Sequence, residues 1–372
     1  MRITSVELRR VRLAFLAPIR TAAGTSAVRD LLLVKVETIT GEGWGECAAL
    51  SEPTYTAEYV EGAAAVLRSH LVPRLLAAGG EVAGAGAVAP ALAAVRGHHM
   101  AKAALEMAVL DVELRAAGVS LAERLGGTRS TVEAGVALGI APSVGALVDA
   151  VGTAVDEGYR RVKLKIEPGW DVEPVAAVRA RFGDGLVLQV DANGAYRVAD
   201  AAHLALLDPF GLAMIEQPLP PDDLAGSAEL ARRIATPICL DESITSAEVA
   251  AGVLAMGAAA VVNVKPGRVG GYLEAARVHD VCLAAGAPVW CGGMFETGLA
   301  RAANLALAAL PGFTLPGDLS PPARYLAADL VAPLLANNGR LQVPSRPGIG
   351  ADLLPDALEE YTTATELLVP PP

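Results

Sequence analysis

Residues 161–166 read RVKLKI and residues 186–191 read LVLQVD, and a segment with helical spacing of its apolar residues lies between them. Short apolar segments of the same kind recur along the chain, at 132–138, 213–216, 237–241, 260–265, 288–291 and, as the eighth, near 313–316. Most of their ends are spaced by about 25 residues, which is the length of one strand-and-helix unit. This repeat predicts an α/β fold with a (β/α)7β TIM-like barrel over residues 129–320.

The residues before this repeat follow a different pattern. They read as strand-like at 3–15 and 30–38, turn-rich at 41–46, and helical near 57–76 and 102–117. We therefore predict an α+β capping domain over residues 1–128. The C-terminal segment of about 321–372 is expected to complete this domain by packing back onto it.

The composition excludes several classes of protein. Apolar residues make up 53% and charged residues 19% of the chain, as in well-packed globular proteins. A formal net charge of -11 argues against binding to nucleic acid, which needs a basic surface. The apolar windows 249–264 and 302–317 are interrupted by Gly, Asn or Pro, which argues against a membrane span. The N-terminal residues lack the apolar core of a signal peptide, so a cytoplasmic protein is expected.

Polar residues end the predicted barrel strands, where most barrels of this kind place their chemistry. They are Lys163 and Lys165, Asp191, Glu216, Asp241 with Glu242, and Lys265. Three inward carboxylates cannot all stay charged in a low-dielectric barrel mouth without a cation. The alternative, in which each acid forms its own ion pair with a lysine, is less favoured for three acids on consecutive strands. All-oxygen ligation suits Mg²⁺ better than Zn²⁺.

The lysines on the flanking strands indicate the type of reaction. A lysine beside a bound cation and a second lysine is expected to have a lowered pKa, which makes it a usable base. A carboxylate bound to the metal has a more acidic neighbouring C–H, because the cation stabilises the enolate. The pattern therefore predicts removal of a proton from the carbon next to a substrate carboxylate.

Five motifs carry a resemblance to a known family: Lys163-Leu164-Lys165, Val190-Asp191-Ala192-Asn193, Ile215-Glu216-Gln217-Pro218, Leu240-Asp241-Glu242-Ser243 and Asn263-Val264-Lys265-Pro266. In this order, over essentially the whole chain, they resemble the muconate-lactonizing subgroup of the enolase superfamily. The segments 163–170, 265–271 and 290–294 are more closely similar to its o-succinylbenzoate synthase / N-acylamino acid racemase branch.

The resemblance implies a cofactor and a set of site residues. The cofactor is Mg²⁺, for which Mn²⁺ or another divalent ion can substitute. The implied residues are the metal ligands Asp191, Glu216 and Asp241, the catalytic lysines Lys165, Lys265 and Lys163, and the metal- or substrate-adjacent residues Asn193, Glu242, Gly293 and Met294.

The resemblance also implies a function, with alternatives. We expect o-succinylbenzoate synthase, the dehydration of 2-succinyl-6-hydroxy-2,4-cyclohexadiene-1-carboxylate in menaquinone biosynthesis, together with N-acyl/N-succinylamino acid racemase activity. Both would proceed by lysine abstraction of the α-proton of a metal-bound carboxylate. A dedicated N-acylamino acid racemase is the alternative enzyme, and a barrel that only binds a metal carboxylate is the non-enzyme alternative. Ile19 and Ala23 stand where the family usually has aromatic residues, so the acyl group accepted stays open. The expected partners are a small-molecule carboxylate and further copies of the chain in a homo-oligomer.

Overall fold

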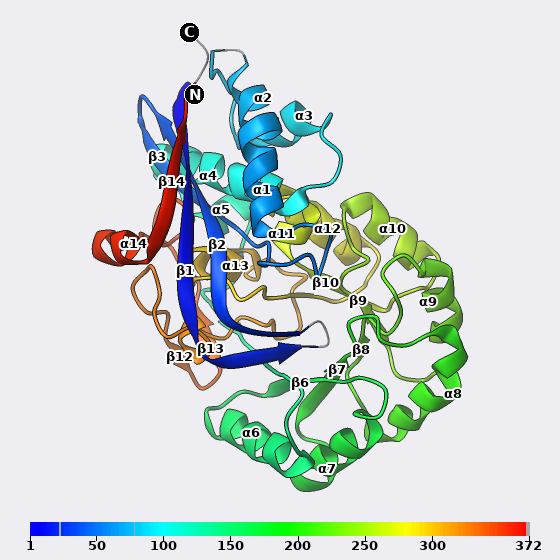
Figure 1. Ribbon diagram of the computed structural model, residues 1–372. Coiled ribbons are helices and arrows are strands. Elements are labelled where there is room, and N and C mark those ends of the chain that lie inside the picture. Colours follow the sequence, from blue (N-terminus) through cyan, green and yellow to red (C-terminus); the bar gives the residue numbers. More distant parts are fainter. Residues whose placement is uncertain (22–23, 78, 370–372) are drawn as a thin grey trace.

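The computed structural model describes residues 1–21, 24–77 and 79–369. Its first part contains an antiparallel sheet of β1 (Ile3–Thr21), β2 (Gly24–Thr38), β3 (Gly41–Cys47) and β14 (Thr362–Leu368), in the order β14-β1-β2-β3 (Figure 1). The last of these strands lies beside the first, with Val6 opposite Leu368. Segments from the two ends of the chain therefore share one sheet.

The helical elements that follow β3 in the chain are α1 (Val60–Val66), a π-helical turn (Leu67–Leu71), α2 (Val72–Leu76), a 3-10 turn (Ala85–Ala87), α3 (Val88–Leu92), α4 (His99–Ala117) and α5 (Leu121–Leu125). Of these, α1 and α4 contact strands of the sheet. Most residues of α4 are buried. A side chain at Gly43 or Gly45 would collide with the backbone of α4, so these glycines of β3 allow the helix to lie directly on the strand.

A curled parallel sheet forms the second part of the molecule. Among the described residues it has seven strands, in the order β11-β10-β9-β8-β7-β6-β5. They are β5 (Val136–Leu138), β6 (Arg161–Lys165), β7 (Val187–Asp191), β8 (Ile215–Glu216), β9 (Ile238–Leu240), β10 (Val261–Val264) and β11 (Val289–Cys291). The fold is thus the expected α/β, TIM-like barrel with a separate antiparallel unit at its N-terminal side.

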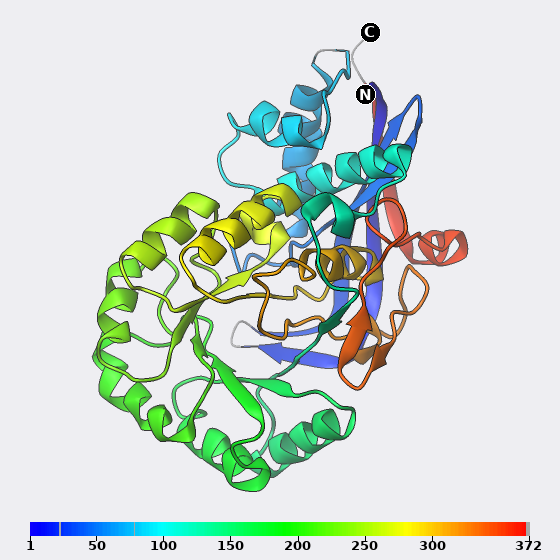
Figure 2. The same cartoon turned by 180° about the vertical axis from the view of Figure 1, so that it is seen from behind.

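A ring of helices surrounds these strands, as Figure 2 shows from behind. It contains α6 (Val144–Asp156), α7 (Val172–Phe182), α8 (Ala201–Leu204), α9 (Leu224–Ala231), α10 (Ala247–Ala255), α11 (Pro266–Val269), α12 (Tyr272–Ala284) and α13 (Gly298–Leu307), with 3-10 turns at Val198–Asp200 and Ala205–Phe210. Several begin at a side chain that accepts a hydrogen bond from the first turn, such as Ser143, Asp223 and Ser246. No helix in the described part of the chain combines the length and apolar character needed to cross a membrane.

The eighth position of the barrel is filled by an irregular segment. Residues 312–318 bond to β11 through Val289 N–H and Asp318 N–H, and to the opposite side through Gly135 N–H, which donates to Gly317 O at 2.6 Å. The segment carries Pro316, which has no N–H to donate, and this explains why it is not a regular strand. The sheet is nevertheless closed near the predicted place.

The predicted strand at 132–138 is divided in two. Its first half, β4 (Thr131–Glu133), pairs with β13 (Arg340–Gln342), which pairs in turn with β12 (Ala336–Asn337). The break falls at Gly135, where an added side chain would overlap the Arg161 guanidinium. The C-terminal segment therefore contacts the start of the barrel through β13 and the antiparallel sheet through β14. It also contains a 3-10 turn (Pro322–Arg324) and α14 (Pro355–Tyr361). The division of the chain near residue 128 stays a prediction.

Candidate active site

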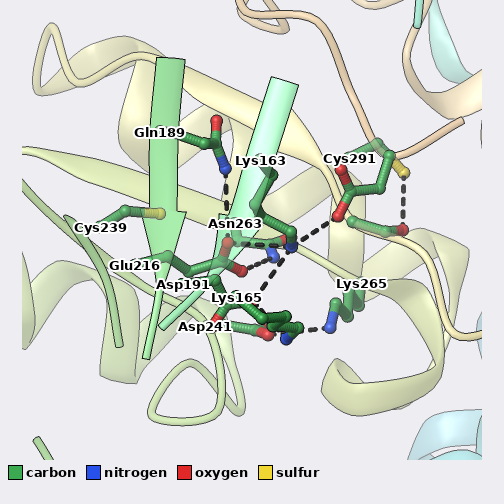
Figure 3. Close-up of polar contacts among 12 residues, drawn as sticks. Lys163, Lys165, Gln189, Asp191, Glu216, Cys239, Asp241, Asn263, Lys265 and Cys291 are labelled. Atoms are coloured by element: carbon green, nitrogen blue, oxygen red, sulfur yellow. Dashed lines mark hydrogen bonds and ion pairs between the residues drawn. The ribbon is translucent and has the colours of Figure 1, made fainter. Parts of the chain in front are cut away.

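Three carboxylates meet at the C-terminal ends of neighbouring strands. Asp191 ends β7, Glu216 ends β8, and Asp241 directly follows β9. Asp191 lies opposite Glu216 in the sheet register, which brings their side chains to the same edge. The exposed fractions of Asp191, Glu216 and Asp241 are 1%, 0% and 1%. Figure 3 shows them converging from separate strands on one region.

The three acids repel one another in this buried position. Burial and the neighbouring Asp191 and Asp241 carboxylates raise the pKa of Glu216 to about 8. Burial alone would also raise the pKa of Asp241, but the Lys265 ammonium and the Arg268 guanidinium hold it well below its usual value. The cluster therefore needs cations to stay ionised.

In the described residues no three His, Cys, Asp or Glu side chains already stand in ligand geometry, because ammonium groups lie between the acids. Two observations still fit a divalent ion. The donor set is all oxygen, which suits a hard cation. Two buried oxygens next to the acids, Glu242 Oε2 and Asn263 Oδ1, have no hydrogen-bond partner. The residues present can therefore hold such an ion once the ammonium groups move aside.

Lys165 lies between Asp191 and Asn193. Its Nζ is 2.6 Å from Asp191 Oδ2 and also donates to Asn193 Oδ1. Asn193 Nδ2 donates to Glu242 Oε1 at 2.8 Å, so these residues form one chain of contacts. Burial and the charges of Asp241 and Asp191 raise the pKa of Glu242 to about 7. The structure thus places Asn193 and Glu242 beside the acids.

Lys265 follows β10 and approaches Asp241 from the other side. Its Nζ is 2.8 Å from Asp241 Oδ2, 3.2 Å from the Tyr55 hydroxyl and 3.6 Å from Met294 Sδ. Burial works to lower the pKa of Lys265, but the Asp241 carboxylate outweighs it and raises the pKa above its usual value. The lowering of a lysine pKa beside a bound cation stays a prediction, because Asp241 is the partner of Lys265 in this arrangement.

Lys163 lies deeper than Lys165 on the same face of β6. Its Nζ is 3.1 Å from Asp191 Oδ2, 3.0 Å from Glu216 Oε2 and 2.6 Å from Asp318 Oδ2. Asp191 and Glu216 thus share Lys163, whereas Asp241 pairs with Lys265 and Arg268. Each of the three acids has a lysine within ion-pair distance, so the alternative of ion pairs between acids and lysines stays open beside the metal site. The sequence contains five lysines, and three of them lie here.

Of the two glycines after Cys291, the structure brings Gly292 and not Gly293 against Lys265. A side chain at Gly292 would begin 2.5 Å from Lys265 Cε. At Gly293 it would meet Asp318 O and the Arg301 guanidinium instead. A role of Gly293 in substrate binding stays a prediction.

Some residues of the site were missed by the sequence reasoning. Tyr55 donates from its hydroxyl to Asp241 Oδ1 at 2.9 Å, although it comes from the loop before α1 and no motif marks it. Arg268 forms an ion pair with Asp241. Its position in the sequence, three residues after Lys265, could have identified Arg268 as a candidate site residue. Asn263 Nδ2 donates to Glu216 Oε1 at 2.8 Å, and strand alternation puts Asn263 on the same face as Lys265.

A cavity of about 170 Å³ lies next to Phe295, one residue beyond Met294. Phe15, Ile19, Arg29 and Leu50 are among the residues that line it, so the first hairpin and the loop before α1 meet the barrel here. This part of the N-terminal unit contains Ile19, which stands where the family usually has an aromatic residue. Ala23, singled out with Ile19 in the sequence, lies outside the described residues.

The comparisons with known proteins agree with this architecture. Residues 3–126 match the N-terminal domain model of mandelate racemase / muconate lactonizing enzyme, and residues 146–357 match the enolase C-terminal domain-like model. An N-succinylamino acid racemase of Amycolatopsis sp is 59% identical over 98% of both chains. An o-succinylbenzoate synthase of Geobacillus kaustophilus is 44% identical over 98% of this chain and 97% of its own.

A solved structure gives the same result for the fold. The crystal structure of an enolase superfamily member from Listeria innocua superposes with a TM-score of 0.95, at 37% identity and over 100% of both chains. Enzymes of that superfamily generally depend on a divalent metal ion. The chain belongs to the enolase superfamily.

Proposed function

We propose that the chain is an o-succinylbenzoate synthase that dehydrates 2-succinyl-6-hydroxy-2,4-cyclohexadiene-1-carboxylate, and that it also racemises N-succinylamino acids. The observation that carries this proposal is the pair Lys165 and Lys265, which approach one carboxylate cluster from different strands. Relatives that carry each of the two names align over nearly the whole chain. The 59% identity to a racemase favours a dedicated N-acylamino acid racemase as the second candidate.

We further propose that Asp191, Glu216 and Asp241 hold Mg²⁺, with Mn²⁺ as a substitute. The ion would supply positive charge to the substrate carboxylate and so acidify the neighbouring C–H. Lys165 would take the proton from that carbon. In the synthase reaction the adjacent carbon loses its hydroxyl, which leaves as water with a proton from Lys165, and the Lys265 ammonium stabilises the negative charge. In the racemase reaction Lys265 returns a proton to the opposite face.

The charges of the site support a substrate with two carboxylates. Five cationic side chains surround the cluster: Arg161, Lys163, Lys165, Lys265 and Arg268. Five carboxylates face them: Asp191, Glu216, Asp241, Glu242 and Asp318. Glu216 and Glu242, whose pKa values burial and neighbouring acids raise to about 8 and about 7, are expected to ionise when a divalent ion binds, and the ion then adds two positive charges to a balanced set. Both the cyclohexadiene substrate and the N-succinylamino acids carry two carboxylates, which would restore the balance.

Solvent exchange tests the proposal. The purified chain is incubated in D₂O with each enantiomer of an N-succinylamino acid, with and without Mg²⁺, and loss of the α-proton is followed by NMR. Conversion of the cyclohexadiene substrate is followed by absorbance. We expect Mg²⁺-dependent exchange and conversion. If neither occurs, the proposal is wrong and the barrel only binds its ligand; exchange without conversion would favour the dedicated racemase.

A glycine substitution probes the placement of Lys265. Gly292→Ala puts a methyl group against Lys265 Cε and the Asn263 side chain, and we expect kcat to fall by about 100-fold, because a displacement of about 1 Å is enough for this. Gly252→Ala, in an exposed turn of α10 with open space around it, is the matched control and should leave kcat unchanged. An unchanged kcat in Gly292→Ala would contradict the assigned position of Lys265.

A further inference from the structure

Asp318 lies on the irregular segment that closes the barrel, between the buried cationic side chains of Lys163 and Arg161. Its Oδ2 is 2.6 Å from Lys163 Nζ, and its Oδ1 is 2.7 Å from Arg161 NH1. The Asp318 side chain is 12% exposed, and those of Lys163 and Arg161 are 4% and 1% exposed. Each oxygen of the carboxylate thus has a cationic partner, and little of the side chain reaches solvent.

Several contacts fix Asp318 in place. Its backbone N–H donates to Cys291 O at 2.9 Å, and its backbone oxygen accepts from Arg301. Arg161 is itself held, because its guanidinium donates to Pro316 O at 2.7 Å. The absence of a side chain at Gly135 leaves the room that this guanidinium fills. The closing segment and the start of β6 therefore present Asp318 to Lys163 in one defined position.

Of the carboxylates that contact Lys163, some would become ligands of a bound metal and one would stay with the lysine. Lys163 contacts three carboxylates, and two of them, Asp191 and Glu216, are proposed metal ligands. A divalent ion on those two would leave Lys163 beside it with Asp318 as its remaining anionic contact. A buried ammonium without a counter-charge next to a divalent cation is strongly unfavourable. The face of Trp290, 5.0 Å from Lys163 Nζ, compensates for only a small part of this.

We propose that Asp318 is a positioning residue that draws the Lys163 ammonium away from Asp191 and Glu216 and so frees these two carboxylates for the divalent ion. This inference rests on the proposed metal site and adds to it a residue from the eighth position of the barrel. Asp318 acts through Lys163 and is not among the proposed metal ligands.

Metal affinity, measured apart from catalysis, tests this role. The chain is stripped of metal with EDTA, dialysed and titrated with Mn²⁺ alone, and free Mn²⁺ is measured by its EPR signal. We expect Asp318→Asn to raise the Kd for Mn²⁺ at least about tenfold, because the ion must then displace Lys163 from its only remaining anionic partners. Asp318→Glu keeps the charge and should recover part of the affinity.

A double variant separates positioning from structural support. Lys163→Met combined with Asp318→Asn removes the ammonium as well as its partner, so its Kd should return to the wild-type value or below. Asp111→Asn is the matched control. Asp111 is a buried carboxylate paired with Arg115 on α4, so its loss should lower the Tm and leave the Kd unchanged.

The outcomes are distinguishable. A wild-type chain that does not bind Mn²⁺ would overturn the proposed metal site, and this inference with it. A wild-type chain that binds, with Asp318→Asn binding equally well, would overturn the inference alone. So would a double variant as weak as Asp318→Asn, since a role in folding would not be relieved by the loss of Lys163.

Discussion

Replacing Lys165 with alanine is expected to lower kcat for α-proton exchange by about 10²- to 10⁴-fold, the range of a lost general base. The loss should depend on the enantiomer. If Lys165 and Lys265 serve opposite faces of the substrate, Lys165→Ala should abolish exchange from one enantiomer more than from the other, and Lys265→Ala should show the opposite preference. Single-enantiomer N-succinylamino acids in D₂O, followed by NMR, measure both losses.

A lysine outside the site provides the control. Lys35 forms ion pairs with Glu37 and Glu42 on the antiparallel sheet, far along the chain from the barrel strands, and Lys35→Ala should leave exchange unchanged. Equal residual exchange from both enantiomers in Lys165→Ala and in Lys265→Ala would contradict the two-base assignment. For the cyclohexadiene substrate the loss should be smaller in Lys265→Ala than in Lys165→Ala, because Lys265 supplies charge there and moves no proton.

Removing divalent ions with EDTA is expected to lower both activities by at least about 10³-fold, since the charge that develops on the substrate carboxylate then has no counter-ion. Mg²⁺ or Mn²⁺ added back should restore them. The fold should persist without metal, because ammonium and guanidinium groups lie against Asp191 and Asp241 and can neutralise them. Circular dichroism of the stripped chain checks this directly.

A stability measurement gives an independent readout of the same metal. An ion that binds only the folded chain stabilises it by about 2.7 kcal/mol at a concentration one hundred times its Kd, so Mg²⁺ should raise the Tm in a concentration-dependent way. Glu216→Gln removes a proposed ligand and should abolish this rise. A rise of equal size in Glu216→Gln would show that Mg²⁺ binds elsewhere, and full activity in EDTA would contradict the metal assignment.

The repeat of strands and the convergence of their ends could be predicted from the sequence. Asp191, Glu216 and Asp241 end strands about one strand-and-helix unit apart, and parallel strands place such ends at one edge. Strand alternation likewise puts Lys163 and Lys165 on one face, and both contact the acids. These positions follow from strand periodicity alone, because the place of each residue depends only on the strand that carries it.

Contacts between distant segments could not be predicted in this way. Tyr55 reaches Asp241 from the N-terminal unit, and nothing in the sequence around Tyr55 encodes how that unit docks on the barrel. The break at Gly135 depends on the volume of Arg161, a residue on the following strand. The partners of Asp318 could not be predicted either, because its segment is irregular and has no alternation to follow. Each of these contacts depends on how separate segments of the chain pack against one another.

The pairing of β14 with β1 also affects how the chain is made. On the ribosome β1 emerges before the barrel strands, and its neighbour β14 emerges only after all of them have been synthesised. Until then β1 has an open edge, which is a site for association with other nascent chains. Folding of the barrel can precede completion of the antiparallel sheet, and the nascent chain is most vulnerable to aggregation during that interval.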